Sequence, residues 1–311
     1  MLDLFLLILP LYLLMLVGFV AIKTKLLPQD AIPTLGGFVL NIAMPALMIN
    51  SFMSQDISES LNLGYLLAYA IGSLVVFGAL ALVFSLVLRK PFSHAIIAGF
   101  GSSTSNTGFV GLPVVTMVFG TSVFAAVSMT ILVESLLMLP LALILAEAGQ
   151  QKEKKLLGIL RDTLRNLTRS PLLIAIVSGS ILSALGIRFP EPVVKTIGLL
   201  GGSAIPCALM IIGGVLATTK STGINLQPAW ISISKLALHP AAMALAFLLF
   251  PGVPEEMRVT GIVLAASPML TIYPIIGSQF NLQSLCATAL IIATTLSFLT
   301  ITVTLTLVGR A

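Results

Sequence analysis

Most of the side chains that could do chemistry lie in two short segments of otherwise apolar sequence. Residues 101–113 read Gly-Ser-Ser-Thr-Ser-Asn-Thr-Gly-Phe-Val-Gly-Leu-Pro. Three glycines, a proline and six side chains that can hydrogen-bond make this segment a poor continuous helix. Residues 266–274 read Ala-Ser-Pro-Met-Leu-Thr-Ile-Tyr-Pro, with two prolines six residues apart. Both segments therefore predict an interrupted helix.

A broken helix exposes backbone N–H groups where one half begins and C=O groups where the other half ends. The N–H end favours an anion and the C=O end a small cation. In hydrocarbon such groups are tolerated only where protein or water satisfies them, so the two breaks are expected to meet in a shared polar cavity. The alternative is a pair of proline kinks whose serines bond back to their own helix.

Polar side chains at both breaks are the predicted ligands of a substrate or ion. They are Ser103, Asn106 and Thr107 in the first segment and Ser267 and Thr271 in the second. Asn106 offers both an amide donor and a carbonyl acceptor, so it could bind a ligand or tie the breaks together. The residues expected to shape the backbone are Gly108, Gly111, Pro113, Pro274, Pro45 and Pro206.

Lys235, His239 and Glu134 are ionisable side chains within apolar runs, where function is the default hypothesis. Lys235 could hold a carboxylate or exchange with a coupling proton, or it could snorkel or cap the carbonyls of a broken half-helix. His239, one helical turn later, is either a core histidine or a proton relay. Glu134 could bind Na⁺ or H⁺, or pair with a cation from another helix.

The composition excludes a soluble enzyme, a nucleic-acid binder and a disordered scaffold. Of 311 residues, 58% are hydrophobic and 9% are charged, and the mean hydropathy is +1.12. A soluble domain carries about 25% charged residues to wet its surface. The chain is therefore expected to be integral to the lipid bilayer. Cys207 and Cys286 lie in apolar stretches and are expected to be reduced, and no metal site is predicted.

A spanning helix needs about 20 apolar residues, and that length divides the chain into ten predicted spans. They are 4–22, 31–53, 61–88, 92–119, 121–146, 171–187, 191–217, 228–250, 257–280 and 284–308. The polar segment 147–170 is predicted to be a cytoplasmic linker between two five-helix repeats, 1–146 and 171–311.

Basic residues in the loops predict the orientation in the cell membrane. Loops on the side of the linker hold eleven of them, against four in the other loops and at the C-terminal end, so both termini are expected outside. The eleven are Lys23, Lys25, Arg89, Lys90, Lys152, Lys154, Lys155, Arg161, Arg165, Arg169 and Lys220.

An internal repeat is indicated when the sequence is shifted by 161 residues. The shift superimposes Pro10 on Pro171, Pro45 on Pro206 and Pro113 on Pro274. With five spans in each half, the second copy would enter from the opposite side, which is an inverted repeat of the kind found in secondary transporters. The predicted fold is all-α, with broken helices 4 and 9 crossing near mid-membrane.

Three motifs resemble the auxin efflux carrier family, whose fold is shared with the bile acid:sodium symporter group. Residues 105–113 are similar to its S-N-T-G-F-x-G-x-P, and residues 40–47, which include Asn41, to its L-N-x-x-x-P-A-L. Lys235, Leu236 and Pro240 are similar to its K-L-x-x-x-P. The resemblance implies crossing broken helices, a carboxylate substrate such as malonate, malate or auxin, and a homodimer, and it adds Asn41 to the candidate ligands.

The predicted function is secondary active transport of a small organic anion by alternating access, coupled to H⁺ or Na⁺, with no other cofactor. The sequence has no G-x-x-x-x-G-K-[ST] motif for ATP. One alternative is a sodium-coupled bile-acid-type symporter or cation antiporter, although the four aspartates fall near span ends or in loops. A remoter alternative is an intramembrane hydrolase, for which neither a mid-span aspartate pair nor a Gly-x-Ser-x-Gly motif is present.

Overall fold

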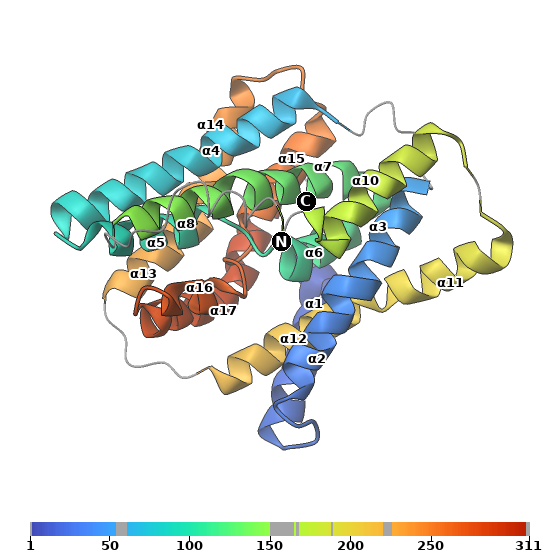
Figure 1. Ribbon diagram of the computed structural model, residues 1–311, viewed down its shortest axis with the longest axis horizontal. Coiled ribbons are helices and arrows are strands. Elements are labelled where there is room, and N and C mark those ends of the chain that lie inside the picture. Colours follow the sequence, from blue (N-terminus) through green and yellow to red (C-terminus); the bar gives the residue numbers. More distant parts are fainter. Residues whose placement is uncertain are drawn as a thin grey trace.

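A computed structural model describes residues 2–53, 61–149, 165, 168–187, 189–219 and 226–308 (Figure 1). These residues form helices and connecting turns, with no strand among them, which confirms the all-α class. Most of the predicted linker 147–170 lies outside the described residues. Both described cysteines are free thiols.

Among the described residues, seven helical segments are long and apolar enough to cross a membrane. Several of them join two α-helices through a five-residue π-helical turn (η). The segments are α1 (Leu2–Lys23), α2–η1–α3 (Ala31–Phe38, Val39–Ala43, Met44–Met53), α4–η3 (Leu63–Leu82, Val83–Val87), α7–η6–α8 (Phe124–Val133, Glu134–Met138, Leu139–Ala148), α11–α12 (Glu191–Gly202, Ala204–Thr218), α13–η7–α14 (Leu226–Ile233, Ser234–Leu238, His239–Leu248) and α17 (Gln283–Leu307).

The other three predicted spans are shorter or interrupted. Residues 171–187 contain the 14-residue helix α10 (Pro171–Ala184). Residues 92–119 divide into α5 (Phe92–Ser103), η4 (Thr107–Gly111) and α6 (Leu112–Phe119), and the 3₁₀ turn η5 (Gly120–Val123) follows. Residues 257–280 divide between α15 (Glu255–Ala265) and α16 (Tyr273–Ser278). Both interruptions coincide with the predicted breaks.

The helices pack into two bundles (Figure 1). The first bundle contains α1–α3 and α10–α12, and the second contains α4–α8 and α13–α17. In the first bundle, α1 lies so close to α12 that a Cβ atom at Gly213 would collide with the Met15 carbonyl oxygen. Each bundle therefore combines helices from both halves of the sequence.

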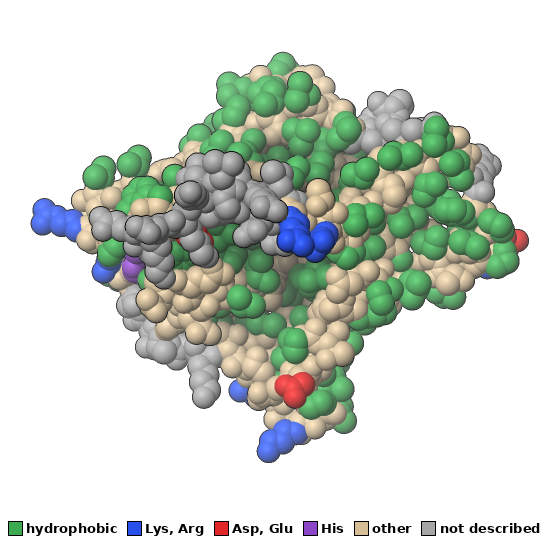
Figure 2. Space-filling model, viewed as in Figure 1, with side chains coloured by type: hydrophobic (Ala, Val, Ile, Leu, Met, Phe, Trp, Pro, Cys, Tyr) green, Lys and Arg blue, Asp and Glu red, His purple; other side chains and the backbone are tan. Residues whose placement is uncertain are grey.

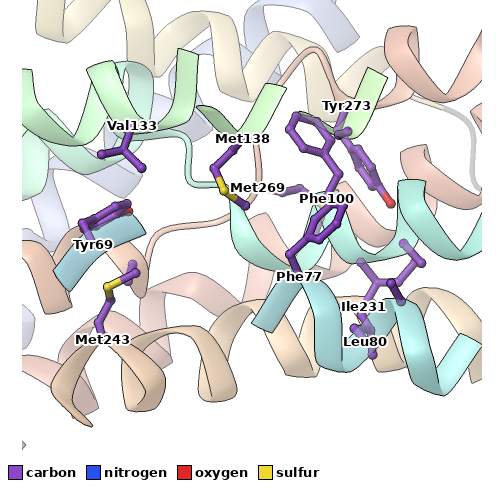
Figure 3. Packing of buried hydrophobic residues seen from close by; sticks show 14 of the residues in the cluster. Tyr69, Phe77, Leu80, Phe100, Val133, Met138, Ile231, Met243, Met269 and Tyr273 are labelled. Atoms are coloured by element: carbon purple, nitrogen blue, oxygen red, sulfur yellow. The ribbon is translucent and has the colours of Figure 1, made fainter. Parts of the chain in front are cut away.

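The second bundle has an aromatic and aliphatic core that reaches the second break. The rings of Phe100 in α5 and Tyr273 in α16 lie side by side, with centroids 6.3 Å apart (Figure 3). The Tyr273 hydroxyl donates to the Ile97 carbonyl at 3.0 Å, and its ring occupies the space in which Gly101 lacks a side chain. The end of one broken helix and the beginning of the other are thus packed together.

The outer surface is apolar, as a lipid environment requires. Hydrophobic side chains are spread over most of the face seen in Figure 2, and few charged side chains appear on it. Large side chains such as Leu199 and Leu307 are about four-fifths exposed (79% and 80%). Because soluble monomers rarely expose apolar surface on this scale, the packing agrees with a multi-pass membrane protein.

Candidate functional site

The first break begins where α5 ends, and three polar side chains at this point bond back to carbonyl groups of α5. Ser102 and Ser103 both donate to the Gly99 carbonyl, at 2.7 and 2.9 Å, and Thr104 donates to the Phe100 carbonyl at 2.8 Å. Such back-bonding competes with the regular helical hydrogen bonds and favours the end of a helix. Ser103, a predicted ligand, is used within its own helix in this structure.

Asn106 then caps the helix that follows the first break. Its side-chain oxygen accepts from the Phe109 amide at 3.2 Å, and its backbone carbonyl accepts from the amides of Val110 and Gly111. The amides of Thr107 and Gly108 have no hydrogen-bond partner within the described part of the chain. Gly108 is half-buried whereas Thr107 is buried, so this helix start is accessible at Gly108.

The second break separates α15 from α16 and contains fewer polar side chains. Residues 266–272 are not helical, and Pro274 lies in the first turn of α16, where a missing N–H leaves no hydrogen bond unmade. Pro113 has the same position at the start of α6. Pro274 therefore begins its half-helix, whereas Pro113 follows η4 within the half-helix that begins at Thr107.

The two breaks are in direct contact. The Asn106 amide donates to the Pro268 carbonyl at 2.7 Å, and the Asn106 side-chain amide donates to the Thr271 hydroxyl at 2.6 Å. Gly111 faces the Ser267 hydroxyl, which is buried and has no partner among the described residues. The structure thus brings together the predicted residues Asn106, Thr271, Ser267 and Gly111.

Glu134 binds the first break from the neighbouring segment α7–η6–α8. Its carboxylate accepts from the Ser105 amide at 2.7 Å, the Thr107 hydroxyl at 2.9 Å and the Tyr69 hydroxyl at 3.4 Å. The helix dipole places about half a positive charge near a helix start, so the carboxylate lies where that field favours it. Thr107, which was predicted to be a ligand, therefore hydrogen-bonds Glu134 in this structure.

Lys235 binds the second break and is completely buried (0% exposed). Its ammonium group donates to the Ala265 carbonyl at 2.6 Å, the Ser105 hydroxyl at 2.9 Å and His239 Nδ1 at 2.9 Å. Ala265 is the last residue of α15, so the ammonium caps the carbonyl end of that half-helix. This geometry matches the capping alternative for Lys235, and the side chain does not snorkel.

His239 is held in one tautomer by its two neighbours. An ammonium group can only donate, so Nδ1 must accept from Lys235, and Nε2 then donates to the Ser73 hydroxyl at 3.1 Å. Ser105 joins the two charges, since its amide binds Glu134 and its hydroxyl binds Lys235. The charged and polar groups therefore form one buried network.

Five members of this network were not among the predicted site residues: Ser105, Tyr69, Ser73, Tyr65 and Thr130. The Tyr65 hydroxyl bonds the Thr130 hydroxyl at 2.7 Å, next to the Tyr69–Glu134 contact. Tyr65, Tyr69 and Ser73 recur every four residues along the apolar segment 61–88. A polar stripe with helical spacing in a lipid-embedded helix is the signal that could have identified them.

A second missed signal is the spacing of prolines, since four of the π-helical turns end two residues before one. The pairs are Ala43 and Pro45, Gly111 and Pro113, Met138 and Pro140, and Leu238 and Pro240. Proline lacks an N–H group and its ring crowds the preceding turn, and a wider turn relieves both problems. Glu134 and Lys235 lie in two of these turns, so the prolines influence the directions in which the two charged side chains point.

Three predicted residues lie in the first bundle, away from this network. Asn41 is exposed on η1 and has no hydrogen bond to either break among the described residues. Pro45 is buried in α3, and Pro206 is half-buried in α12. The first bundle nevertheless touches the first break, because a Cβ atom at Gly108 would lie 3.2 Å from the Met44 methyl carbon.

A lipid-facing helical protein with two broken helices and a buried ionic network has the construction of a membrane transporter. Comparison with known proteins agrees with this class. Residues 3–305 match the family described as membrane transport protein, the auxin efflux carrier family, and the chain belongs to this family. The chain is accordingly a transporter and not an enzyme.

One relative gives a more specific similarity. It is a protein of Rhizobium meliloti (strain 1021) named "Putative malonate transporter", and the two sequences are 27% identical over 292 residues. The aligned region covers 93% of this chain and 91% of the relative. The similarity therefore extends over nearly the whole of both proteins.

Proposed function

We propose that the protein is a secondary active transporter that moves a small carboxylate, such as malonate, malate or an auxin-like acid, across the cell membrane. The observation that carries the proposal is the open helix start at Thr107 and Gly108, beside the contact between Asn106 and Thr271. Two free amides at the positive end of a helix suit a carboxylate. The name of the malonate relative supports the same substrate class.

The proposed binding residues divide into two groups. Asn106 and Thr271, with the amides of Thr107 and Gly108, contact the substrate at the open side of the breaks. Glu134, Lys235 and His239 form the wall behind them, where their bonds to the breaks set the backbone geometry. Ser267 lies between the two groups, and its unpartnered hydroxyl can turn toward the substrate.

The proposed topology has ten membrane crossings in two inverted repeats, with both termini outside. The seven long segments, the shorter α10 and the two broken helices together give ten. Each broken helix is the fourth crossing of its half, and each bundle takes matching segments from both halves. Cysteines introduced at 153 and 256 are expected to react with impermeant reagents from the cytoplasm and from outside, respectively; labelling of 153 in intact cells would reverse this orientation.

Alternating access follows in this proposal from movement of the second bundle against the first. A cavity of about 450 Å³ lies between Thr218 and Thr219 of the first bundle and Pro274, Gln283 and Ala287 of the second. Pro274 adjoins the second break, so this cavity gives the break a route toward one side of the membrane. The proposal also includes a homodimer, which the mass of the purified protein in nanodiscs tests.

The experiment is uptake of radiolabelled malonate, malate and indole-3-acetate into proteoliposomes under an imposed pH or Na⁺ gradient. Thr271→Val should raise the KM for the carried acid at least fivefold while the protein remains folded. Thr300→Val, in a half-buried position on α17, is the matched control and should leave uptake unaltered. Wild-type uptake no greater than that of empty liposomes for all three acids would reject the proposal.

A further inference from the structure

We infer that the Lys235 ammonium group is a resident cation, which occupies the second break in place of a coupling sodium ion. For its consequence in transport, this inference rests on the proposed function. Its structural part concerns only the groups around the ammonium. These groups are the Ala265 carbonyl, the Ser105 hydroxyl and His239 Nδ1.

The position of the ammonium is one that attracts a small cation. The carbonyl end of a half-helix carries about half a negative charge, and unwound carbonyls in broken helices coordinate Na⁺ in secondary transporters. Lys235 places its charge 2.6 Å from the carbonyl oxygen of Ala265, the last residue of α15. The same charge binds the Ser105 hydroxyl from the other break at 2.9 Å.

The third ligand favours an ammonium group over a metal cation. Na⁺ is a hard cation, and hard cations select oxygen ligands over an imidazole nitrogen. An imidazole nitrogen is a good acceptor for an N–H donor, and His239 Nδ1 accepts at 2.9 Å. The three donors of the ammonium are therefore matched by three acceptors, with His239 in turn fixed by Ser73.

The charge balance of the network leaves no place for a second cation. Glu134 is the one carboxylate that reaches Ser105 among the described residues, and Lys235 already compensates it across that residue. The other titratable groups of the network are Tyr65, Tyr69 and His239, and none of them supplies a second negative charge near neutral pH. A sodium ion added beside the ammonium would bring two like charges together in a medium of low dielectric constant.

The functional consequence is that the two breaks are joined permanently, without binding of an ion from solution. Transport of a carboxylate by this protein should therefore proceed equally in Na⁺, K⁺ and N-methylglucamine media. Removal of the ammonium should change this behaviour, because it leaves the Ala265 carbonyl and the Glu134 carboxylate in a space that a small cation fits. Without Lys235, a small cation from solution can thus take the place of the ammonium group.

The test compares the wild type with Lys235→Ala and Lys235→Met in two assays. Initial malonate uptake into proteoliposomes is measured in the three media, and the melting temperature in detergent is measured with ammonium, methylammonium, Na⁺ or choline. Lys235→Ala should lose at least tenfold in uptake and should melt at a higher temperature with methylammonium, ammonium or Na⁺ than with choline. Lys235→Met fills the vacated volume with apolar atoms, so it should not respond to cations. Lys195→Ala, which removes an exposed lysine on α11, is the control for loss of charge.

Each outcome either supports or overturns the inference. Sodium-independent wild-type uptake together with a cation response confined to Lys235→Ala would support the inference. Wild-type uptake that falls at least fivefold without Na⁺ would overturn it, even if neither variant folds. A folded Lys235→Ala protein that melts at the same temperature in all four salts would also overturn it. The melting assay does not depend on the substrate, so failure of the proposed carboxylate would leave this arm decisive.

Discussion

The two broken helices differ in how the backbone groups at their ends are hydrogen-bonded. The first break uses several of its own side chains: Ser102, Ser103 and Thr104 bond back to α5, and Asn106 caps the helix that follows. The second break has no such set, and the last carbonyl of α15 depends on Lys235 from another helix. Removal of a hydroxyl at the first break should therefore matter little, whereas the second break depends on a single ammonium group.

The charged residues also distinguish the two breaks in the sequence. The shift of 161 residues relates the two breaks, yet it pairs Lys235 with Leu74 and Glu134 with Thr295. Each charge thus belongs to only one half of the sequence. The shift matches the positions of the two breaks in the sequence, and the charged residues make the two breaks chemically different.

The largest effect is expected for Lys235→Met. A buried carboxylate that loses its compensating charge costs about 3–5 kcal/mol, so the protein should melt at a clearly lower temperature. Malonate uptake should fall at least tenfold, which corresponds to about 1.4 kcal/mol. Uptake and melting temperature are measured on the same preparation. Unaltered values in both would remove Lys235 from the account of the second break.

Glu134→Gln should have a smaller effect, because an amide oxygen can still accept from the Ser105 N–H group. The double variant Glu134→Gln, Lys235→Met should be less destabilised than the sum of the two single variants, since it leaves no uncompensated charge. A double-mutant cycle of melting temperatures measures this coupling. Strictly additive shifts would mean that the two charges do not compensate each other through Ser105.

Asn106→Ala comes next in the order. It removes the cap on Phe109 and the bond to Thr271, and loss of a helix cap costs about 0.5–2 kcal/mol. Asn41→Ala is the matched variant in the first bundle, where the side chain is exposed. We expect Asn106→Ala to lower both stability and uptake, and Asn41→Ala to leave the melting temperature unchanged. Equal shifts in the two variants would contradict the capping role of Asn106.

Ser103→Ala should have the smallest effect. Its hydroxyl bonds the Gly99 carbonyl, which also accepts from Ser102, so the carbonyl stays satisfied when one donor is removed. Uptake within twofold of the wild type is expected. A fall of more than tenfold, with an unchanged melting temperature, would instead support the prediction that Ser103 binds substrate.

The sequence was sufficient to predict both breaks, because glycine, proline and clustered hydroxyl groups disfavour a helix wherever they occur together. It also identified Lys235 and Glu134, within apolar runs, and Asn106, at the first break, as candidate site residues. It could not give their partners. Ser105 lies 29 residues from Glu134 and 130 from Lys235, so only the tertiary packing decides which hydroxyl joins them.

The π-helical turns are a local feature that was not predicted from the sequence. A proline six residues after Glu134 and five after Lys235 widens each helix just before it. Lys235 and His239, which are four residues apart, still contact each other across such a turn.

The most direct test of the central claim is the initial rate of radiolabelled malonate uptake into sodium-free proteoliposomes, for the wild type and for Lys235→Met side by side. The account predicts saturable uptake by the wild type that excess unlabelled malonate suppresses, and uptake at least tenfold lower in the folded variant. Equal rates in the two proteins, or wild-type uptake no greater than that of empty liposomes, would contradict it.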